Sequence, residues 1–170
     1  MPALLEKIEI STNGYSPLSG LTNLEKLTFR GNKLNNNYFK IDGNCLITKG
    51  SNEDYSDGKM IFGFNDVIIP NYINTLPDNL FRENYSITSL TLHKNITSVG
   101  TSSLKNMRNS YGYGAIKAFN YPGTLNEFKT KISNNTSFYD LLKQTVYSDV
   151  ILNYKDENGK DVSIKMNNLI

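Results

Sequence analysis

Two octapeptides 23 residues apart share one pattern of apolar residues. The first reads IPNYINTL from Ile69 to Leu76, and the second reads LHKNITSV from Leu92 to Val99. The same register also places Val67 over Leu90, so apolar positions match apolar ones beyond the octapeptides. A period of this length predicts stacked repeats, each of which buries an apolar face against its neighbour.

A second pair of segments begins nearer the N-terminus. LEKIEI at residues 5–10 recurs as LEKLTF at residues 24–29, and the later copy continues to Asn32 and Leu34. Leu-x-x-Leu-x-Phe-x-x-Asn-x-Leu follows the consensus of leucine-rich repeats. Its last two apolar residues point to one face of a short strand. An asparagine after the strand can satisfy backbone groups at the turn, and the candidates for this role are Asn13, Asn32 and Asn95.

The later repeats resemble the BspA-like leucine-rich repeats found on the surfaces of bacteria and some protists. The segments that carry the resemblance are VIIPNYINTLPDNLF at residues 67–81 and ITSVG at residues 96–100. Residues 39–64 look like the hairpin that these proteins insert between repeats, and YPGT at residues 121–124 looks like the segment that closes the array. The first two units lack the Ile-Pro of the family. The resemblance implies surface attachment or host interaction, and it supplies no catalytic residues.

The expected fold is α/β or mainly β: a leucine-rich-repeat solenoid over residues 1–125, with a β-hairpin inserted at about 39–64. Residues 126–170 should form a helix-plus-hairpin cap that shields the last repeat within a single structural unit. Helical spacing covers 125–133 and 138–145, and Asn158-Gly159 predicts the turn of a hairpin. Short parallel strands are expected near residues 5–10, 24–29, 66–69, 89–92 and 117–121.

Composition argues against several classes of function. The 170 residues carry 18 basic and 16 acidic side chains, a net charge of +2 without the clustering of a nucleic-acid site. No stretch approaches the roughly 20 apolar residues that span a bilayer. Cys45 is the single cysteine, which excludes a disulfide framework and a cysteine-based zinc site. No signal peptide is visible, and we expect the sequence to begin after one.

Few residues are candidates for catalysis or metal binding. His93 is the single histidine, so no second histidine is available for a base relay. Its ring is either an ordinary exposed or half-buried side chain or part of a binding site. Cys45 is read as a packed thiol in preference to a nucleophile. The oxygen-rich residues 156–161 resemble part of a calcium loop, but a hairpin turn explains them without a metal. We therefore expect no cofactor.

The concave sheet is the candidate site, because outward positions of successive strands form an extended mixed surface. We expect a non-enzymatic, monomeric module at the cell surface or outside the cell, which binds a protein or glycan in adhesion or host interaction. A structural spacer in a longer array is the alternative. A calcium-dependent or glycan-acting enzyme is a third, although Glu9 is the one carboxylate in the central column. The candidate binding residues are Glu9, Ser11, Thr28, Arg30, Ile68, Thr91, His93 and Asn120.

Overall fold

A computed structural model describes residues 27, 35, 38–50, 58–104, 107, 116–134 and 149–169. For residues 132–134 it describes the backbone only. The strands expected at 5–10 and 24–29 and the helix expected at 138–145 lie outside these residues. So do the turn candidates Asn13 and Asn32 and four candidate binding residues, Glu9, Ser11, Thr28 and Arg30.

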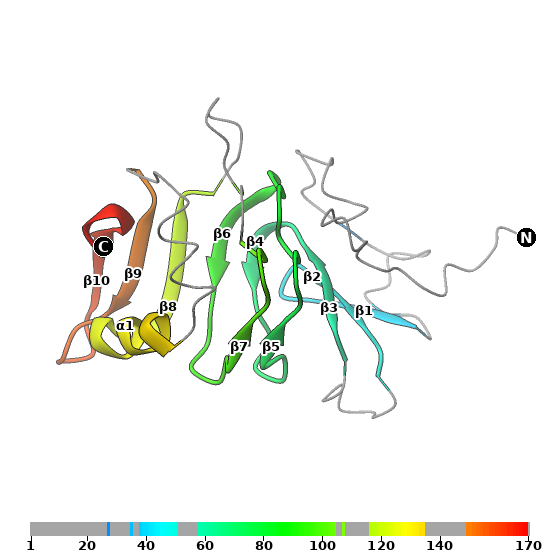
Figure 1. The fold of residues 1–170 in the computed structure, drawn as a ribbon, viewed down its shortest axis with the longest axis horizontal. Helices are drawn as coiled ribbons and strands as arrows, with labels where there is room; N and C mark the ends of the chain where they lie inside the picture. The colour runs from blue at the N-terminus through cyan, green and yellow to red at the C-terminus, as the bar shows by residue number, and fades with distance from the viewer. Residues whose placement is uncertain are drawn as a thin grey trace, which may run out of the picture.

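The described chain is mainly β, with one α-helix among its elements (Figure 1). The first three strands, β1 (Phe39–Asp42), β2 (Cys45–Thr48) and β3 (Met60–Gly63), form an antiparallel sheet in the order β1-β2-β3. The insert at 39–64 was expected to be a hairpin, and it has a third strand because the returning chain pairs again with β2. Gly43 and Asn44 both have positive φ, which suits the two-residue turn between β1 and β2.

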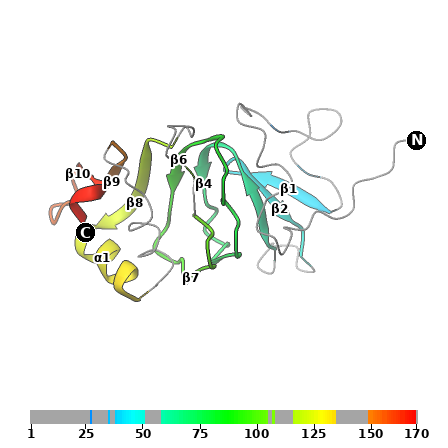
Figure 2. The ribbon, with the colours of Figure 1, turned by 45° about the horizontal axis from the view of Figure 1, so that its top comes forward.

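A five-stranded mixed sheet forms the body of the molecule (Figures 1 and 2). Its strand order is β10-β9-β8-β6-β4, and every neighbouring pair is parallel except the antiparallel pair of β9 and β10. A second parallel pair joins β5 (Thr75–Leu76) to β7 (Ser98–Val99). The strands of the large sheet are β4 (Asn65–Ile68), β6 (Ile87–Thr91), β8 (Ala118–Thr124), β9 (Ile151–Lys155) and β10 (Asp161–Lys165).

The 23-residue register read from the sequence is the register of the paired strands. Val67 lies beside Leu90 in the large sheet, and Leu76 lies beside Val99 in the two-stranded sheet. Apolar residues at equivalent positions therefore stack in one continuous core, where Val67, Leu76 and Leu90 are fully buried.

Backbone turns repeat with the same period. The Ile73 amide donates to the Pro70 carbonyl at 2.9 Å, and the Ile96 amide donates to the His93 carbonyl at 3.4 Å, 23 residues later. Asn79 and Ser102, also 23 residues apart, have φ of 58° and 57°. The two units therefore share a backbone path as well as an apolar pattern.

The helix α1 (Leu125–Asn134) begins at a capping box directly after β8. The Thr124 amide donates to Glu127 Oε2 at 2.7 Å, and the Glu127 amide donates to Thr124 Oγ1 at 3.2 Å. These reciprocal bonds satisfy backbone donors that would otherwise lack partners at a helix start. Phe128 packs its ring against Tyr121, with centroids 5.5 Å apart, so α1 covers the end of β8.

The C-terminal hairpin of β9 and β10 forms as expected, with its turn at residues 156–160. Asp156 Oδ1 accepts the amides of Asn158 and Lys160, each at 2.9 Å, and Gly159 has a φ of 79°. Beyond the expectation, β9 also pairs in parallel with β8, so the hairpin continues the large sheet. The short 3-10 helix η1 (Met166–Leu169) follows and buries Met166.

Candidate binding face

One row of side chains crosses the large sheet on the face opposite the core. Consecutive pairings place Ile68, Thr91, Asn120, Asn153 and Ser163 side by side across β4, β6, β8, β9 and β10. We call these five residues the polar row, because amides and hydroxyls follow Ile68 at one end. The structure thus brings together three predicted candidates and adds two residues that the sequence interpretation did not include.

The polar row is joined by hydrogen bonds that all run in one direction. Ser163 Oγ donates to Asn153 Oδ1 at 2.7 Å, and Asn153 Nδ2 donates to Asn120 Oδ1 at 2.7 Å. Asn120 Nδ2 then donates to Thr91 Oγ1 at 3.0 Å. Each of these groups is therefore held in one orientation by its neighbour, so the face carries a fixed pattern of donors and acceptors.

Ile68 stands at the far end of the row with 55% of its surface exposed. Its backbone is fixed by the insert, because the Ile68 amide donates to the Gly43 carbonyl at 2.7 Å. A Cβ at Gly43 would lie 2.0 Å from the Ile68 carbonyl oxygen, so this close approach requires glycine. The β1–β2 turn therefore supports an exposed apolar side chain at the edge of the face.

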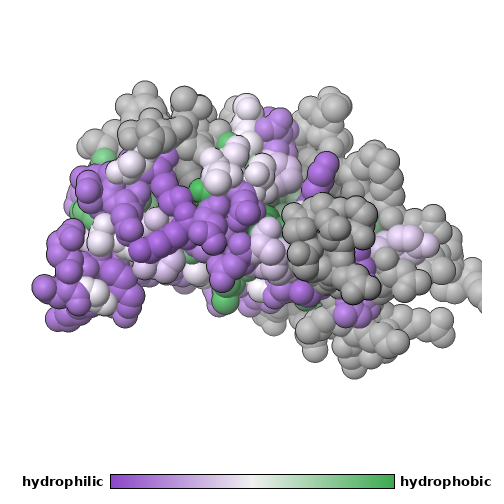
Figure 3. All heavy atoms as spheres, turned by 90° about the horizontal axis from the view of Figure 1, so that it is seen from below, coloured by the Kyte–Doolittle hydropathy of each residue, from purple (hydrophilic) through white to green (hydrophobic). Residues whose placement is uncertain are grey.

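A hollow of about 430 Å³ opens beside the polar row. The members of the row that line it are Ile68, Thr91, Asn120 and Asn153, and His93, Pro122 and Tyr154 line it as well. Two charged residues, Lys155 and Asp161, also line it, and they form an ion pair at 2.6 Å. The hollow thus combines amide and hydroxyl groups, apolar surface and one paired charge. Among the described residues that are seen from below Figure 1, hydrophilic side chains predominate at the surface (Figure 3).

Asp66 lies on the same face, towards the start of β4. Its carboxylate accepts hydrogen bonds from Thr88 Oγ1 at 2.5 Å and from Ser89 Oγ at 2.9 Å. These two hydroxyl donors hold the pKa of Asp66 below its usual value. Its hydrogen bonds join β4 to β6 in the strand pair that carries Ile68 and Thr91.

His93 borders the hollow, but it is largely buried and its ring is held within the turn. Its ring is 7% exposed, with Nε2 3.0 Å from the Ile73 carbonyl oxygen. Nδ1 accepts the Asn95 amide at 3.2 Å, so Nε2 carries the proton and donates to Ile73. His93 therefore closes the turn and ties it to the preceding repeat. The side chain that accepts the turn amide is that of His93, in place of the expected Asn95.

Cys45 is a packed thiol. The side chain is fully buried, and Sγ lies 3.4 Å from the Gly43 carbonyl oxygen and 3.5 Å from that of Ile68. Burial, followed by the nearby charge of Asp42, raises the pKa of the thiol. A nucleophilic cysteine needs the opposite shift.

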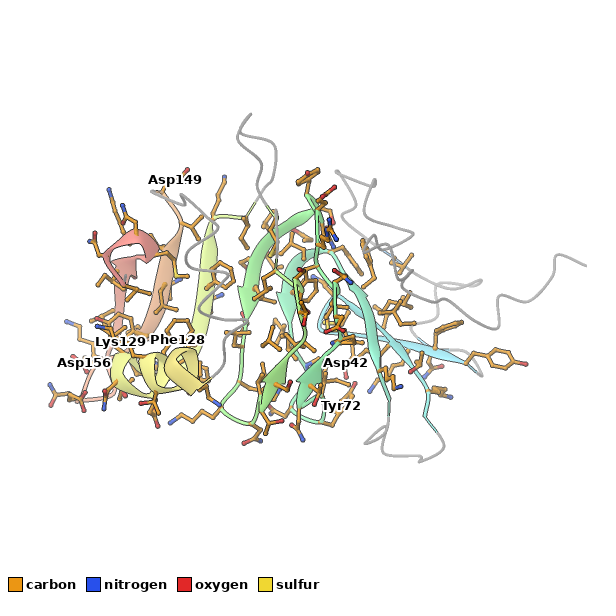
Figure 4. All side chains as sticks on the ribbon, in the orientation of Figure 1. Asp42, Tyr72, Phe128, Lys129, Asp149 and Asp156 are labelled. Carbon is orange, nitrogen blue, oxygen red and sulfur yellow. The ribbon has the colours of Figure 1, made fainter. Side chains whose placement is uncertain are left out.

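A second polar cluster joins the insert to the repeat turn at residues 70–73. Tyr72 OH donates to Asp42 Oδ2 at 2.7 Å, and the two side chains lie together in Figure 4. Lys40 Nζ lies 3.0 Å from Asp42 Oδ2 and 5.1 Å from the centre of the Tyr72 ring. Burial raises the pKa of Asp42, but the bonds from Tyr72 and Lys40 outweigh it and hold the pKa below its usual value.

In the described part of the chain, no three His, Cys, Asp or Glu residues gather as a metal site would require. The same residues include no helix with the length and apolar character to cross a membrane. The alternation of Asn153 and Ser163 with apolar Leu152, Tyr154 and Ile164 indicates from the sequence which face of their hairpin they share, but not that the hairpin joins the large sheet. Comparison with known proteins gave no matching family model, no similar curated protein and no similar solved structure.

Proposed function

We propose that this chain is a non-enzymatic module that binds a macromolecule, protein or glycan, through the polar row and its hollow. The observation that carries the proposal is the pre-organised row itself. Hydrogen bonds lock four neighbouring polar side chains on an open sheet face, beside a hollow of about 430 Å³ with an exposed isoleucine at its edge. Extended binding surfaces of this kind are typical of repeat proteins.

We also propose that the repeats are those of a leucine-rich-repeat solenoid of the BspA-like type on a bacterial surface. The support is the 23-residue register of β4 with β6 and of β5 with β7, and the turns that recur with that period. The insert at residues 39–64 and the segment at residues 121–124 lie where that family places them relative to the repeats. Adhesion or host interaction is the role that follows from this resemblance.

The chemistry of the row supports binding in preference to catalysis. Its side chains are amides, hydroxyls and one aliphatic group, which donate and accept hydrogen bonds without supplying a base near neutral pH. A spacer remains the second candidate, and one observation favours it. Part of the hydrogen-bonding capacity of the row is already used within the protein.

The test is direct binding of the purified chain to arrayed matrix proteins and glycans, measured by biolayer interferometry. Ile68→Asp places a charge on an exposed apolar side chain and should abolish binding while the fold is retained. Asn95→Ala, on an exposed turn outside the hollow, is the control. Saturable binding that Ile68→Asp removes and Asn95→Ala retains supports the proposal. Binding that both variants retain moves the site elsewhere, and no binding to any target favours the spacer.

A further inference from the structure

The hydrogen bonds of the polar row leave a defined set of groups unused by the protein. A side-chain amide has two N–H donors and two carbonyl lone pairs. Asn120 and Asn153 each spend one donor and one lone pair within the row. Each therefore retains one N–H and one lone pair. Thr91 accepts from Asn120 and retains its own hydroxyl proton.

These unused groups repeat at the spacing of strands. Thr91, Asn120 and Asn153 lie on adjacent strands, which are about 4.8 Å apart in any sheet. A ligand that runs across the strands therefore meets a donor and an acceptor at each step. Sugar hydroxyls match this demand, because every hydroxyl both donates and accepts. An extended peptide satisfies its backbone best along a sheet edge and less well on a face.

Apolar surface borders the amides. Ile68 is 55% exposed, and Pro122, which lines the same hollow, is exposed too. The C–H faces of a sugar ring can pack against such side chains while the ring hydroxyls reach the amides. The hollow therefore offers both kinds of surface that a pyranose ring presents.

The charges of the hollow favour a neutral ligand. Lys155 is the one lysine or arginine among the residues that line the hollow, and Asp161 already pairs with it at 2.6 Å. A sulfated or carboxylated ligand would have to displace Asp161 and bring a like charge beside it. A neutral ligand leaves the ion pair intact.

Building on the proposed function, we infer that the ligand of the polar row is a neutral glycan that lies across β6, β8 and β9. Asn120 and Asn153 bind its hydroxyls through their unused N–H groups and lone pairs. Ile68 on β4, beside Thr91, and Pro122 on β8 each pack against the C–H face of a sugar ring. Thr91 donates to the next hydroxyl along the glycan.

The experiment titrates the chain with cello-, chito- and maltooligosaccharides, with a heparin oligosaccharide as the charged comparison. Calorimetry and saturation-transfer NMR report binding. The variants Asn120→Asp and Asn153→Asp keep the size of each side chain and remove its N–H donors. Asn95→Asp is the matched control, because it makes the same change at an exposed turn residue outside the hollow. Circular dichroism confirms that each variant is folded.

We expect at least one neutral series to bind, with a loss of about tenfold or more in each row variant and unchanged affinity in Asn95→Asp. Neutral binding that survives both row variants, or stronger binding of heparin at the row, overturns the inference. If arrayed matrix proteins bind in an Asn120-dependent manner and no neutral glycan does, the ligand class is wrong and the binding face stands. If neither glycans nor proteins bind, the inference and the proposed function both fail.

Discussion

Replacement of Gly100 by alanine should destabilise the protein, because the backbone at Gly100 packs closely against the backbone of the preceding repeat. A Cβ built on Gly100 would lie 2.3 Å from the Asp78 amide nitrogen and 2.4 Å from the Pro77 carbonyl carbon. Ordinary contacts between such atoms lie near 3.5–4.0 Å, so the two segments would have to separate by about 1 Å. The obstructing atoms belong to the backbone and cannot rotate away.

The segments are also bonded to one another at this point. The Gly100 amide donates to the Leu76 carbonyl at 2.7 Å, and the Thr101 amide donates to Asp78 Oδ1 at 2.6 Å. Overpacking in a rigid site lowers the free energy of unfolding by about 1–3 kcal/mol. Because Gly100→Ala would also strain these two hydrogen bonds, we expect a loss near the upper end of that range. For a chain of this size, the melting temperature should fall by roughly 2–4 °C per kcal/mol.

The assay is urea unfolding followed by circular dichroism, with thermal unfolding as the second measurement. Ser98→Ala is the matched control, because Ser98 is an exposed residue of β7 in the same segment. It should change the free energy of unfolding by no more than about 0.5 kcal/mol. A Gly100→Ala protein as stable as Ser98→Ala would refute the close packing of residues 77–78 against 100.

Four further predictions concern other contacts. Asn84→Ala should lower the free energy of unfolding in urea by about 1–3 kcal/mol, because the buried amide donates to the Gly63 carbonyl at 2.7 Å. A variant as stable as the parent would show that this bond is unimportant. Double-mutant cycles of Asp42→Asn and Tyr72→Phe should give a coupling of about 1 kcal/mol near neutral pH. The pKa of Asp42 is lowered in the folded state. The coupling should therefore be complete above the unfolded pKa of about 3.9, and it should be lost as the pH falls through the folded pKa. A coupling that is unchanged in acid would contradict this prediction. Cys45 should resist thiol reagents such as DTNB until the protein is unfolded, and rapid labelling of the native chain would contradict its burial. His93→Ala should lower the free energy of unfolding by about 1–3 kcal/mol, and a variant as stable as the parent would contradict the two hydrogen bonds of its ring.

The repeats were predictable because they rest on local periodicity. Apolar residues at fixed offsets identified β4 and β6 to within two residues, and the 23-residue offset gave their pairing register. Asn158-Gly159 gave the C-terminal hairpin for a similar reason, since the turn needs a positive φ that Gly159 supplies. The helix at 125–134 also matched its predicted span closely, because its apolar spacing is local.

Contacts between distant segments were not predictable in the same way. β9 pairs with β8 across a long intervening segment, and no short motif specifies which strand will join an existing sheet edge. Asn153 was therefore left out of the candidate site, although its pairing with Asn120 follows directly once β9 is placed. The contacts of His93 were missed for another reason. Strand alternation placed it beside the open face, where it does border the hollow, but alternation does not indicate that the chain turns after β6 and that the ring bonds the Ile73 carbonyl.

The claim that the polar row binds a ligand is tested most directly by NMR. The isotope-labelled chain is titrated with the strongest ligand from the binding array, and amide chemical shifts are followed. We predict saturable shifts of the side-chain amide signals of Asn120 and Asn153, together with the backbone signals of Ile68 and Thr91. Shifts confined to α1 or to the β1–β2–β3 sheet, or no saturable shift at all, would contradict the claim.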